Sequence, residues 1–338
     1  MTSLTLTPQE AAPLLEHTHG IVLDHPLIPL GSELASTFKG TAAGRSFAVK
    51  MQASSTRELP IQIWRAEVAA HLCALGQPVP QVLNARDGGL VGSASHEGAS
   101  VAITVSDWIA AAPYGELGAA LDTAGPDTAG PGTATFARNL GATAARLQQA
   151  LQTAPHPPRE VDHTWAAHTM QSVIADHLSR VTDPGTRRLA AAGIELLAAH
   201  VEPIAACLPR ALVHQDLHDS NVLAHPSGTI AAVIDFDDML VGWRVAEPAI
   251  AAAYLARHAA HPAQAVESVA AAWEEVIPFT PEERVAYSAL VRARLALNAT
   301  VWNAREGGDR DDYARMRSDG TARTFEALTA SASALVAP

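Results

Sequence analysis

Two short apolar runs of this sequence are each followed by polar side chains of a kind that could do chemistry. Behind the first run, 211–213, come His214, Asp216 and Asn221, in the order H-x-D-x-x-x-x-N. Behind the second run, 230–234, come Asp235, Asp237 and Asp238. Apolar runs of this length are typical of strands. Acidic side chains at the ends of two strands indicate a place where charge is handled.

The chemistry that fits these residues is phosphoryl transfer. Asp216, on a rigid loop, can accept the proton of an attacking hydroxyl, and Asn221 and Asp235 can hold magnesium against the phosphates. Magnesium prefers oxygen ligands and usually takes one or two protein carboxylates. Alternatively, Asp216 and Asn221 are turn residues and residues 235–238 form a solvated acidic turn. The presence of both motifs, each behind an apolar strand, favours the catalytic interpretation.

This segment resembles the catalytic and metal-binding loops of the aminoglycoside phosphotransferase and choline kinase superfamily. The phrase I-D-F-D-D-M at 234–239, with E-P-A-I-A at 247–251, resembles the hydroxylysine kinase branch. Gln215 stands where the family usually has glycine, and Phe236-Asp237 stands where D-x-G is usual. The resemblance implies an α+β, bilobal, protein-kinase-like fold, with an antiparallel N-lobe sheet carrying one helix and a mostly helical C-lobe. It also implies ATP and magnesium as cofactors.

The N-terminal half contains candidates for holding the nucleotide. Lys50 ends a strand-like run, and a lysine so placed can reach phosphates if a carboxylate fixes its direction. Glu67, in the helix-like stretch that ends at Gly76, is the predicted partner. Residues 31–37 take the place of a phosphate-covering flap, although they lack the G-x-G-x-x-G pattern. Alone, Lys50 would better suit a solvated strand end, whereas its place in the order Lys50, Glu67, Asp216, Asn221, Asp235 favours the functional interpretation.

The resemblance also suggests domain boundaries. It implies an N-lobe over 21–105 and a C-lobe over 106–338, and the capping box at Thr7 adds an N-terminal helix within 1–20. Ser106 and Asp107 resemble the hinge whose backbone binds the adenine edge. Residues 113–135, which contain a tandem D-T-A-G-P repeat, are predicted to be a flexible insertion.

Further side chains are candidates for the acceptor side of the cleft. Acidic residues near the catalytic loop are a reason to expect a cationic group on the acceptor, and the candidates are Asp219, Asp238 and Glu247. Arg294, on the helix that resembles the acceptor-lining helix of this branch, could bind a substrate carboxylate through two hydrogen bonds. An exposed or helix-paired arginine is the alternative.

The elements that must position these residues follow from capping and periodicity. Thr7 with Glu10 and Thr280 with Glu283 form capping boxes that begin helices. Further helices are expected over 136–151, 163–181, 186–207 and 246–260. Strands are expected at 21–23, 47–49, 89–91 and 101–105, with a polar turn over 93–98.

Composition excludes several partners. The 338 residues are 48% hydrophobic and 17% charged, which argues against disorder, and the net charge is −12 with no run of basic residues. Nucleic acid and an anionic membrane are therefore poor partners. Cys73 and Cys207 are expected to be buried free thiols, and the absence of a signal-like or 18-residue apolar segment predicts a cytoplasmic protein.

The sequence thus predicts a kinase that phosphorylates a hydroxyl of an amino alcohol or a hydroxylysine-like hydroxy-amino acid. An antibiotic-inactivating aminoglycoside phosphotransferase is the first alternative. A nucleotide-binding regulator without catalysis is the second. No activation-loop pattern is visible, which disfavours a protein kinase.

Overall fold

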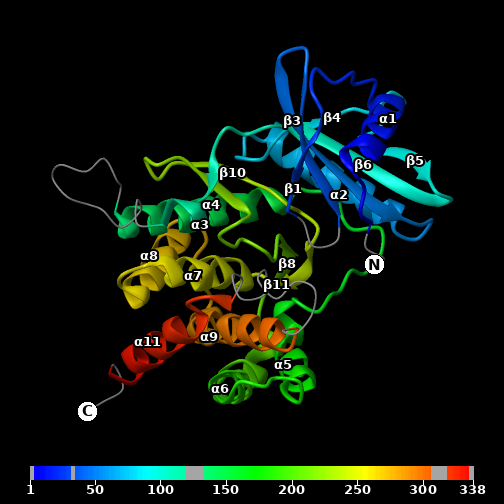
Figure 1. Cartoon of the computed structure of the whole chain (residues 1–338). Helices are drawn as coiled ribbons and strands as arrows, with labels where there is room; N and C mark the ends of the chain where they lie inside the picture. The colour runs from blue at the N-terminus through cyan, green and yellow to red at the C-terminus, as the bar shows by residue number, and fades with distance from the viewer. Residues whose placement is uncertain (1–3, 32–34, 119–131, 306–317, 335–338) are drawn as a thin grey trace. The chain divides into compact units, whose positions relative to one another are not determined.

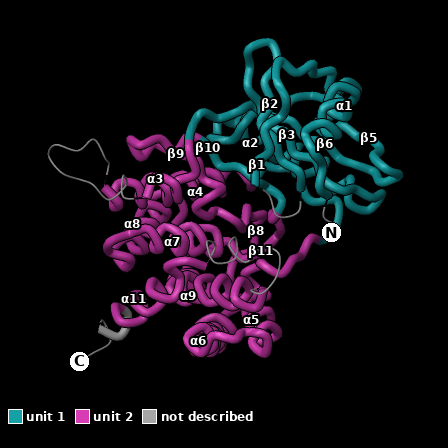
Figure 2. Tube along the Cα trace, in the orientation of Figure 1, with its two compact units in different colours: residues 1–111, 153–160, 232–237 teal, residues 112–152, 161–231, 238–338 magenta. Residues whose placement is uncertain are grey.

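The computed structural model describes residues 4–31, 35–118, 132–305 and 318–334. They form two compact units (Figure 2). Unit 1 contains residues 1–111, 153–160 and 232–237, and unit 2 contains residues 112–152, 161–231 and 238–338. The chain therefore returns to unit 1 twice, and the second return brings Asp235 and Asp237 to the unit that contains Lys50.

Unit 1 is built on an antiparallel sheet (Figure 1). The strands lie in the order β1 (Ile28–Leu30), β2 (Ser36–Ala42), β3 (Arg45–Ser54), β6 (Ala99–Asp107) and β4 (Val82–Leu83), and β5 (Gly92–His96) also pairs with β6. The central strand β3 pairs along its length with β2 and β6, so that Lys50 lies opposite Thr37 on one side and Thr104 on the other. Lys50 is therefore held in the middle of the sheet.

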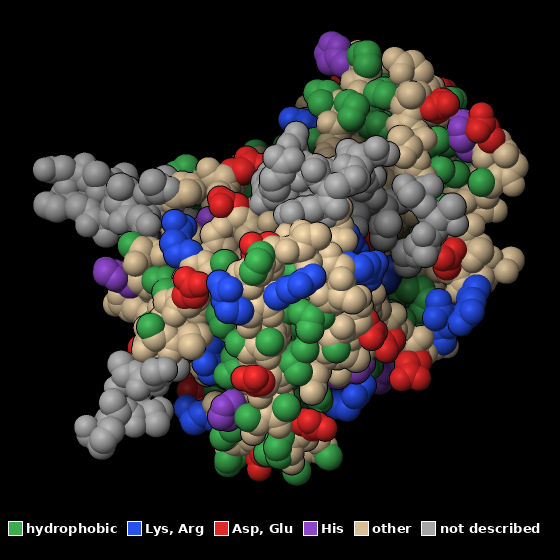
Figure 3. Space-filling view, turned by 60° about the horizontal axis from the view of Figure 1, so that its bottom comes forward, with side chains coloured by type: hydrophobic (Ala, Val, Ile, Leu, Met, Phe, Trp, Pro, Cys, Tyr) green, Lys and Arg blue, Asp and Glu red, His purple; other side chains and the backbone are tan. Residues whose placement is uncertain are grey.

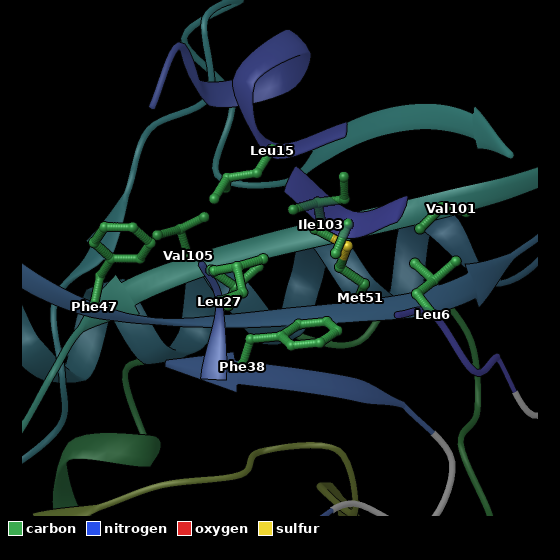
Figure 4. Packing of buried hydrophobic residues seen from close by; sticks show 11 residues of the cluster. Leu6, Leu15, Leu27, Phe38, Phe47, Met51, Val101, Ile103 and Val105 are labelled. Carbon is green, nitrogen blue, oxygen red and sulfur yellow. The ribbon is translucent and has the colours of Figure 1, made fainter. Parts of the chain in front are cut away.

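One face of the sheet forms the hydrophobic core of unit 1 (Figure 4). Phe47, Val49 and Met51 of β3 alternate along the strand and are all buried. They pack with Leu6 and with Leu15 of helix α1 (Pro8–His19). Because side chains alternate across a strand, Lys50 and Gln52 must point to the opposite face.

Helix α2 (Leu59–Ala74) packs near the polar face. Gln62 accepts a hydrogen bond from Ser54 at 2.6 Å, and Trp64 donates one to the carbonyl of Pro155 at 2.8 Å. The backbone N–H of Val233 donates to the carbonyl of Pro78 at 2.7 Å. These contacts fix both returning segments within unit 1.

Unit 2 is mostly helical, which together with the sheet of unit 1 confirms the predicted α+β, kinase-like fold class. Its longer helices are α4 (Thr133–Leu151), α5 (Met170–Leu178), α6 (Pro184–His200), α7 (Ala246–His258), α8 (Pro262–Glu274), α9 (Pro281–Asn303) and α11 (Thr321–Ala334). The shorter ones are α3 (Tyr114–Leu117) and the 3₁₀ helices η2 (Ala167–Thr169) and η3 (Glu202–Cys207). Almost every residue of α9 after Leu290 is buried, so this helix is the centre of the unit.

Two small strand pairs in unit 2 position the loop that carries Asp216. Strand β8 (Arg210–Val213) pairs with β11 (Leu240–Trp243), and β7 (Ala112–Pro113) pairs with β9 (Val222–Ala224). The loop 214–221 begins where β8 ends and finishes where β9 starts. Both of its ends are therefore anchored in strands. Strand β10 (Ile230–Val233) contains the point at which the chain passes back into unit 1.

The predicted helices and strands are largely confirmed, and four predictions are wrong. Residues 21–23 form no strand, and the edge strand begins at Ile28 instead. Residues 89–91 precede a strand, and the predicted polar turn over 93–98 is mostly strand β5. The helix expected from His163 begins only at Met170, after the 3₁₀ turn η2. Of the flap 31–37 and the insertion 113–135, residues 32–34 and 119–131 lie outside the described residues.

The surface carries no simple charge pattern on the face drawn in Figure 3, where acidic and basic side chains are interspersed. Among the described helices, none combines the length and the apolar character needed to cross a membrane.

Candidate active site

The loop after β8 is held in a strained conformation by buried hydrogen bonds. Gln215 is fully buried and has a φ of 70°, a left-handed conformation that costs a non-glycine residue free energy. Its backbone N–H donates to Glu247 at 2.6 Å, and its side-chain amide donates to the carbonyl of Trp165 at 3.3 Å. This conformation explains why a glycine would be favoured here, and the two hydrogen bonds explain how glutamine is tolerated.

The carboxylate of Asp216 is engaged on both oxygens. Oδ2 accepts a hydrogen bond from the side-chain amide of Asn221 at 2.8 Å and lies 3.1 Å from Nε2 of His218. Oδ1 accepts a hydrogen bond from Arg294 at 3.0 Å. The side chain is only 17% exposed. The arrangement fixes the direction of a carboxylate that reaches the surface.

Arg294 itself is buried, with a side-chain exposure of 2%. Its second terminal nitrogen donates to the carbonyl of Trp165 at 3.0 Å. The guanidinium lies 5.2 Å from the ring centroid of Trp165 and 5.5 Å from that of Tyr254, within the range of cation–π attraction. Arg294 was predicted to bind a substrate carboxylate, but its hydrogen bonds go to Asp216 and to the protein backbone.

The acidic residues predicted for the acceptor side also have partners within unit 2. Asp219 is buried and accepts a hydrogen bond from His258 at 2.8 Å. Burial raises its pKa, but hydrogen bonds from His218 and His258 outweigh this effect and hold the pKa well below the usual range. The backbone carbonyl of Asp238 accepts a hydrogen bond from His163 at 2.8 Å. Asp219 therefore has a structural role in addition to any contact with a ligand.

Glu247, at the start of α7, lies beneath the catalytic loop and is 1% exposed. Burial raises its pKa to about 7, although hydrogen bonds from the backbone N–H groups of Gln215 and His214 act in the opposite direction. Glu247 was predicted for the acceptor side, and its contacts are within the protein. Its contacts instead connect α7 to the loop that presents Asp216.

In unit 1, Lys50 contacts two carboxylates. Its ammonium lies 2.8 Å from Oδ1 of Asp235 and 2.8 Å from Oδ2 of Asp237. Burial would lower the pKa of Lys50, but the two carboxylates outweigh it and raise the pKa above its ordinary value. Asp235 has a φ of 63°, a second strained position in the site. The lysine and the second acidic motif are therefore brought together, as the phosphoryl-transfer hypothesis requires.

Glu67, the predicted partner of Lys50, is placed differently. It lies on the exposed face of α2 and takes part in no ion pair among the described residues. Arg65, two residues earlier and nearly on the opposite face of the helix, is buried and lies 3.9 Å from Asp237. The rotation of α2 about its axis turns Arg65 toward the site and Glu67 to solvent.

The predicted hinge lies at the end of β6. Ser106 pairs with Ala48 of β3 and with Val82 of β4. Asp107 forms an ion pair with Arg45 at 3.0 Å, and its backbone N–H donates to the carbonyl of Gln81. Trp108 follows, with the ammonium of Lys39 4.5 Å from its ring centroid. These residues adjoin Ala48, on the sheet face that carries Lys50.

Comparison with known proteins identifies the family. Residues 27–284 match the model of the phosphotransferase enzyme family. The chain belongs to this family. The match covers both units, including Lys50 and the two acidic motifs.

Individual relatives support the branch predicted from the sequence. This phosphotransferase is 28% identical over 167 residues to hydroxylysine kinase from Bos taurus, and 26% identical over 169 residues to that from Mus musculus. These alignments cover 46% of the chain and 44% and 45% of the two relatives, so the chain spans about half of their length.

Solved structures support the fold. The phosphotransferase resembles a microcompartment-associated aminopropanol kinase, with a TM-score of 0.69 at 18% identity over 95% of this chain and 97% of that one. It also resembles an amicoumacin kinase in complex with AMP-PNP and Ca²⁺, with a TM-score of 0.64 at 13% identity over 94% of this chain and 93% of that one.

The oxygen donors of the phosphotransferase suit a hard divalent cation. The side-chain amide nitrogen of Asn221 donates hydrogen bonds to Asp216. Within the described residues, no hydrogen bond to the amide oxygen of Asn221 is found. Asp235 is the most exposed carboxylate at Lys50, at 43%. Amide and carboxylate oxygens of this kind are ligands that magnesium accepts. Within the described residues, no group of three or more His, Cys, Asp or Glu side chains could hold a metal ion by itself.

Sequence reasoning missed three contributors to the site. Gln52 and Arg65 both contact Asp237, and Trp165 offers its carbonyl to Arg294 and Gln215. The one available signal was that Gln52 lies two residues after Lys50, on the same face of a strand. Backbone contacts such as that of Trp165 leave no pattern in a sequence.

Proposed function

We propose that this phosphotransferase moves the γ-phosphoryl group of ATP, with magnesium, to a hydroxyl of an amino alcohol or a hydroxylysine-like hydroxy-amino acid. Asp216 is the proposed general base. Lys50 holds the nucleotide phosphates, and Ser106 and Asp107 are the proposed contacts of the adenine edge. Asn221 and Asp235 are the proposed metal ligands.

The observation that carries the proposal is the environment of Asp216. Its carboxylate is fixed by Arg294 and Asn221 at distances of 3.0 and 2.8 Å, yet it retains some exposure. A carboxylate with a fixed direction at the end of a strand can receive a proton from a substrate hydroxyl. A solvated turn residue would have no reason to be paired with a buried guanidinium.

In the proposed step, the acceptor oxygen forms a bond to the γ-phosphorus while the bond from that phosphorus to the β,γ-bridging oxygen breaks. The hydroxyl proton passes to Asp216, and ADP leaves. Lys50 places its charge beside the phosphates, where positioning and electrostatic stabilisation supply most of the catalysis. Magnesium, when bound, would neutralise charge on the phosphate oxygens.

The proposed acceptor class rests on the relatives and on charge. The curated relatives are hydroxylysine kinases, and a protein of the same fold is an aminopropanol kinase. Both names describe compounds that carry an amine and a hydroxyl. The net charge of −12 favours a cationic acceptor.

A coupled assay of ADP release over a panel of hydroxylated amines tests this function. We expect turnover of at least one amino alcohol or hydroxy-amino acid by the wild type. In Asp216→Asn, kcat should fall on the order of 10³-fold, because a positioned base contributes roughly 10²–10⁴. Asparagine keeps an oxygen for Arg294, so the variant should retain its circular dichroism spectrum and its binding of ATP.

Three results would contradict the proposal. Full turnover in Asp216→Asn would remove Asp216 from the mechanism. Binding of ATP without ADP release from any acceptor would favour a regulator. Reduced drug susceptibility of cells that express the protein would instead favour an aminoglycoside acceptor.

A further inference from the structure

The carboxylates of Asp235 and Asp237 both contact Lys50, but they differ in the number of other side chains that hold them in place. Asp237 accepts a hydrogen bond from Gln52 at 2.5 Å on Oδ2, the oxygen that also contacts Lys50. Its other oxygen faces the buried guanidinium of Arg65 at 3.9 Å. Asp237 is thus fixed by β3 on one side and by α2 on the other.

Asp235 has less support. Apart from the ion pair with Lys50, its carboxylate accepts a hydrogen bond from the backbone N–H of Asp237, at 3.3 Å. Asp235 is also the proposed ligand of magnesium. A carboxylate that is shared with a divalent cation is a weaker partner for an ammonium group, since the cation withdraws its charge. Asp237 is therefore the carboxylate that can hold Lys50 whether or not Asp235 is engaged elsewhere.

The helix next to the lysine contributes a cation instead of an acid. Position 65 of α2 lies beside Asp237, whereas Glu67 points to solvent. The charges at the lysine therefore alternate from the strand to the helix, as Lys50, Asp237 and Arg65. Each carboxylate oxygen of Asp237 faces one of the two cations.

We infer that Asp237 is the positioning residue for Lys50, and that Arg65 locks Asp237 in place. This inference rests on the proposed function, because it concerns the lysine that would hold the phosphates of ATP. Asp237 acts through Lys50 and touches neither the acceptor nor the transferred group.

A double-mutant cycle tests whether Asp237 acts through the lysine. Binding of ATP in the presence of magnesium is measured by calorimetry for the wild type, Asp237→Asn, Lys50→Met and the double variant. We expect Asp237→Asn to weaken ATP binding on the order of tenfold, the worth of one charge-assisted hydrogen bond. In the Lys50→Met background the same change should not weaken binding, because the group that it positions is absent.

Two comparisons separate positioning from a structural role. Binding of adenosine, which lacks phosphates, should be unchanged in Asp237→Asn, whereas a damaged fold would weaken it together with ATP. Glu67→Gln is the rival variant: if Glu67 were the orienting acid, its replacement would couple to Lys50→Met. We expect no such coupling.

Moving the acid to the helix offers a rescue. Asp237→Gly alone should weaken ATP binding as Asp237→Asn does. Adding Arg65→Glu places a carboxylate on α2, close to the position that the Asp237 carboxylate occupied. The double variant should regain at least half of the binding free energy of ATP that Asp237→Gly loses. A merely structural role of Asp237 would leave the double variant weaker than either single variant.

The outcomes distinguish this inference from the proposed function. Equal weakening by Asp237→Asn with and without Lys50, as expected of a direct metal ligand, overturns the inference alone. Binding of ATP with the expected coupling, but without phosphorylation of any acceptor, overturns the proposed function alone. A wild-type chain that binds no ATP overturns both.

Discussion

The guanidinium of Arg294 fixes the direction of the Asp216 carboxylate. Asp216 is the proposed general base, and a general base needs such a fixed direction. The two aromatic rings around Arg294 and the carbonyl of Trp165 hold the arginine in turn. Because both partners are largely out of water, the pair is costly to break: removal of one member leaves the other charge uncompensated.

Replacement of Arg294 by methionine should therefore destabilise the protein by about 3 kcal/mol, the usual cost of an unpaired buried charge. Turnover should also fall at least tenfold, because Asp216 loses its direction. Arg294→Lys keeps the charge but not the planar fork, and should lie between the wild type and Arg294→Met. Urea unfolding and ADP release measure the two effects.

Arg292 offers a matched control on the same helix. Its guanidinium donates to the carbonyl of Ser288 one turn away and takes part in no ion pair among the described residues. Arg292→Met should change stability by about 0.5 kcal/mol or less, as for most surface substitutions. Equal losses of unfolding free energy in Arg292→Met and Arg294→Met would show that the ion pair between Arg294 and Asp216 does not contribute to stability.

Among the elements, α7 has a part that its apolar sequence does not reveal. Its first turn carries Glu247, which accepts the backbone N–H of the strained Gln215. The helix therefore supports the catalytic loop through a carboxyl group that is buried and has a pKa of about 7. A group of this kind makes the stability of the loop depend on pH near neutrality.

The sign of the dependence follows from the direction of the shift. The pKa of Glu247 in the folded protein, about 7, is above its ordinary value of 4.5, so the folded state favours the protonated form. The corresponding stability is fully present below pH 4.5 and is lost as the pH rises through 7. This one group should cost about 3 kcal/mol of stability between those values.

Glu247→Gln resembles the protonated carboxyl and cannot ionise. The difference in unfolding free energy between the wild type and Glu247→Gln, measured by urea titration from pH 5 to pH 8, should therefore move in favour of the variant as the pH rises. A difference that stays constant over this range would mean that Glu247 does not change its protonation there.

Helices and strands were largely predictable because their signals are local. The capping boxes at Thr7 and Thr280 are both present as predicted, and each begins a helix. The rotation of α2 was not predictable. On this helix the apolar Ile63 is exposed, while the polar Gln62 and Arg65 are buried.

The reason is that two of the buried residues of α2 are polar and have polar partners. Arg65 faces Asp237, far away in sequence, and Gln62 accepts a hydrogen bond from Ser54, so hydrophobicity alone does not place these two side chains inside. Ile63 and Glu67 lie one turn apart and share the outward face. The order of the motif residues was therefore informative, whereas the pairing of their side chains required the structure.

Over the whole molecule, the proposed roles are divided between two units that the chain crosses several times. Unit 1 contains Lys50 with Asp235 and Asp237, and unit 2 contains Asp216 with Arg294. The short segment 232–237 is what brings the second acidic motif to the lysine. In the proposed mechanism, Lys50 contacts the phosphate donor and Asp216 contacts the acceptor hydroxyl. These two side chains belong to different units.

The net charge of −12 acts on both ligands at long range, with opposite signs. A cationic acceptor is attracted by such a field, and ATP, an anion even with magnesium, is repelled. Salt shortens the reach of the field from about 10 Å at 0.1 M to about 3 Å at 1 M. Raising the ionic strength should therefore lower kcat/KM for the acceptor several-fold and raise kcat/KM for ATP.

The two ligands serve as controls for each other, because a general effect of salt on the enzyme would move both constants in the same direction. An acceptor constant that does not fall with salt, while the constant for ATP rises, would contradict steering of a cationic acceptor by the charge of the protein.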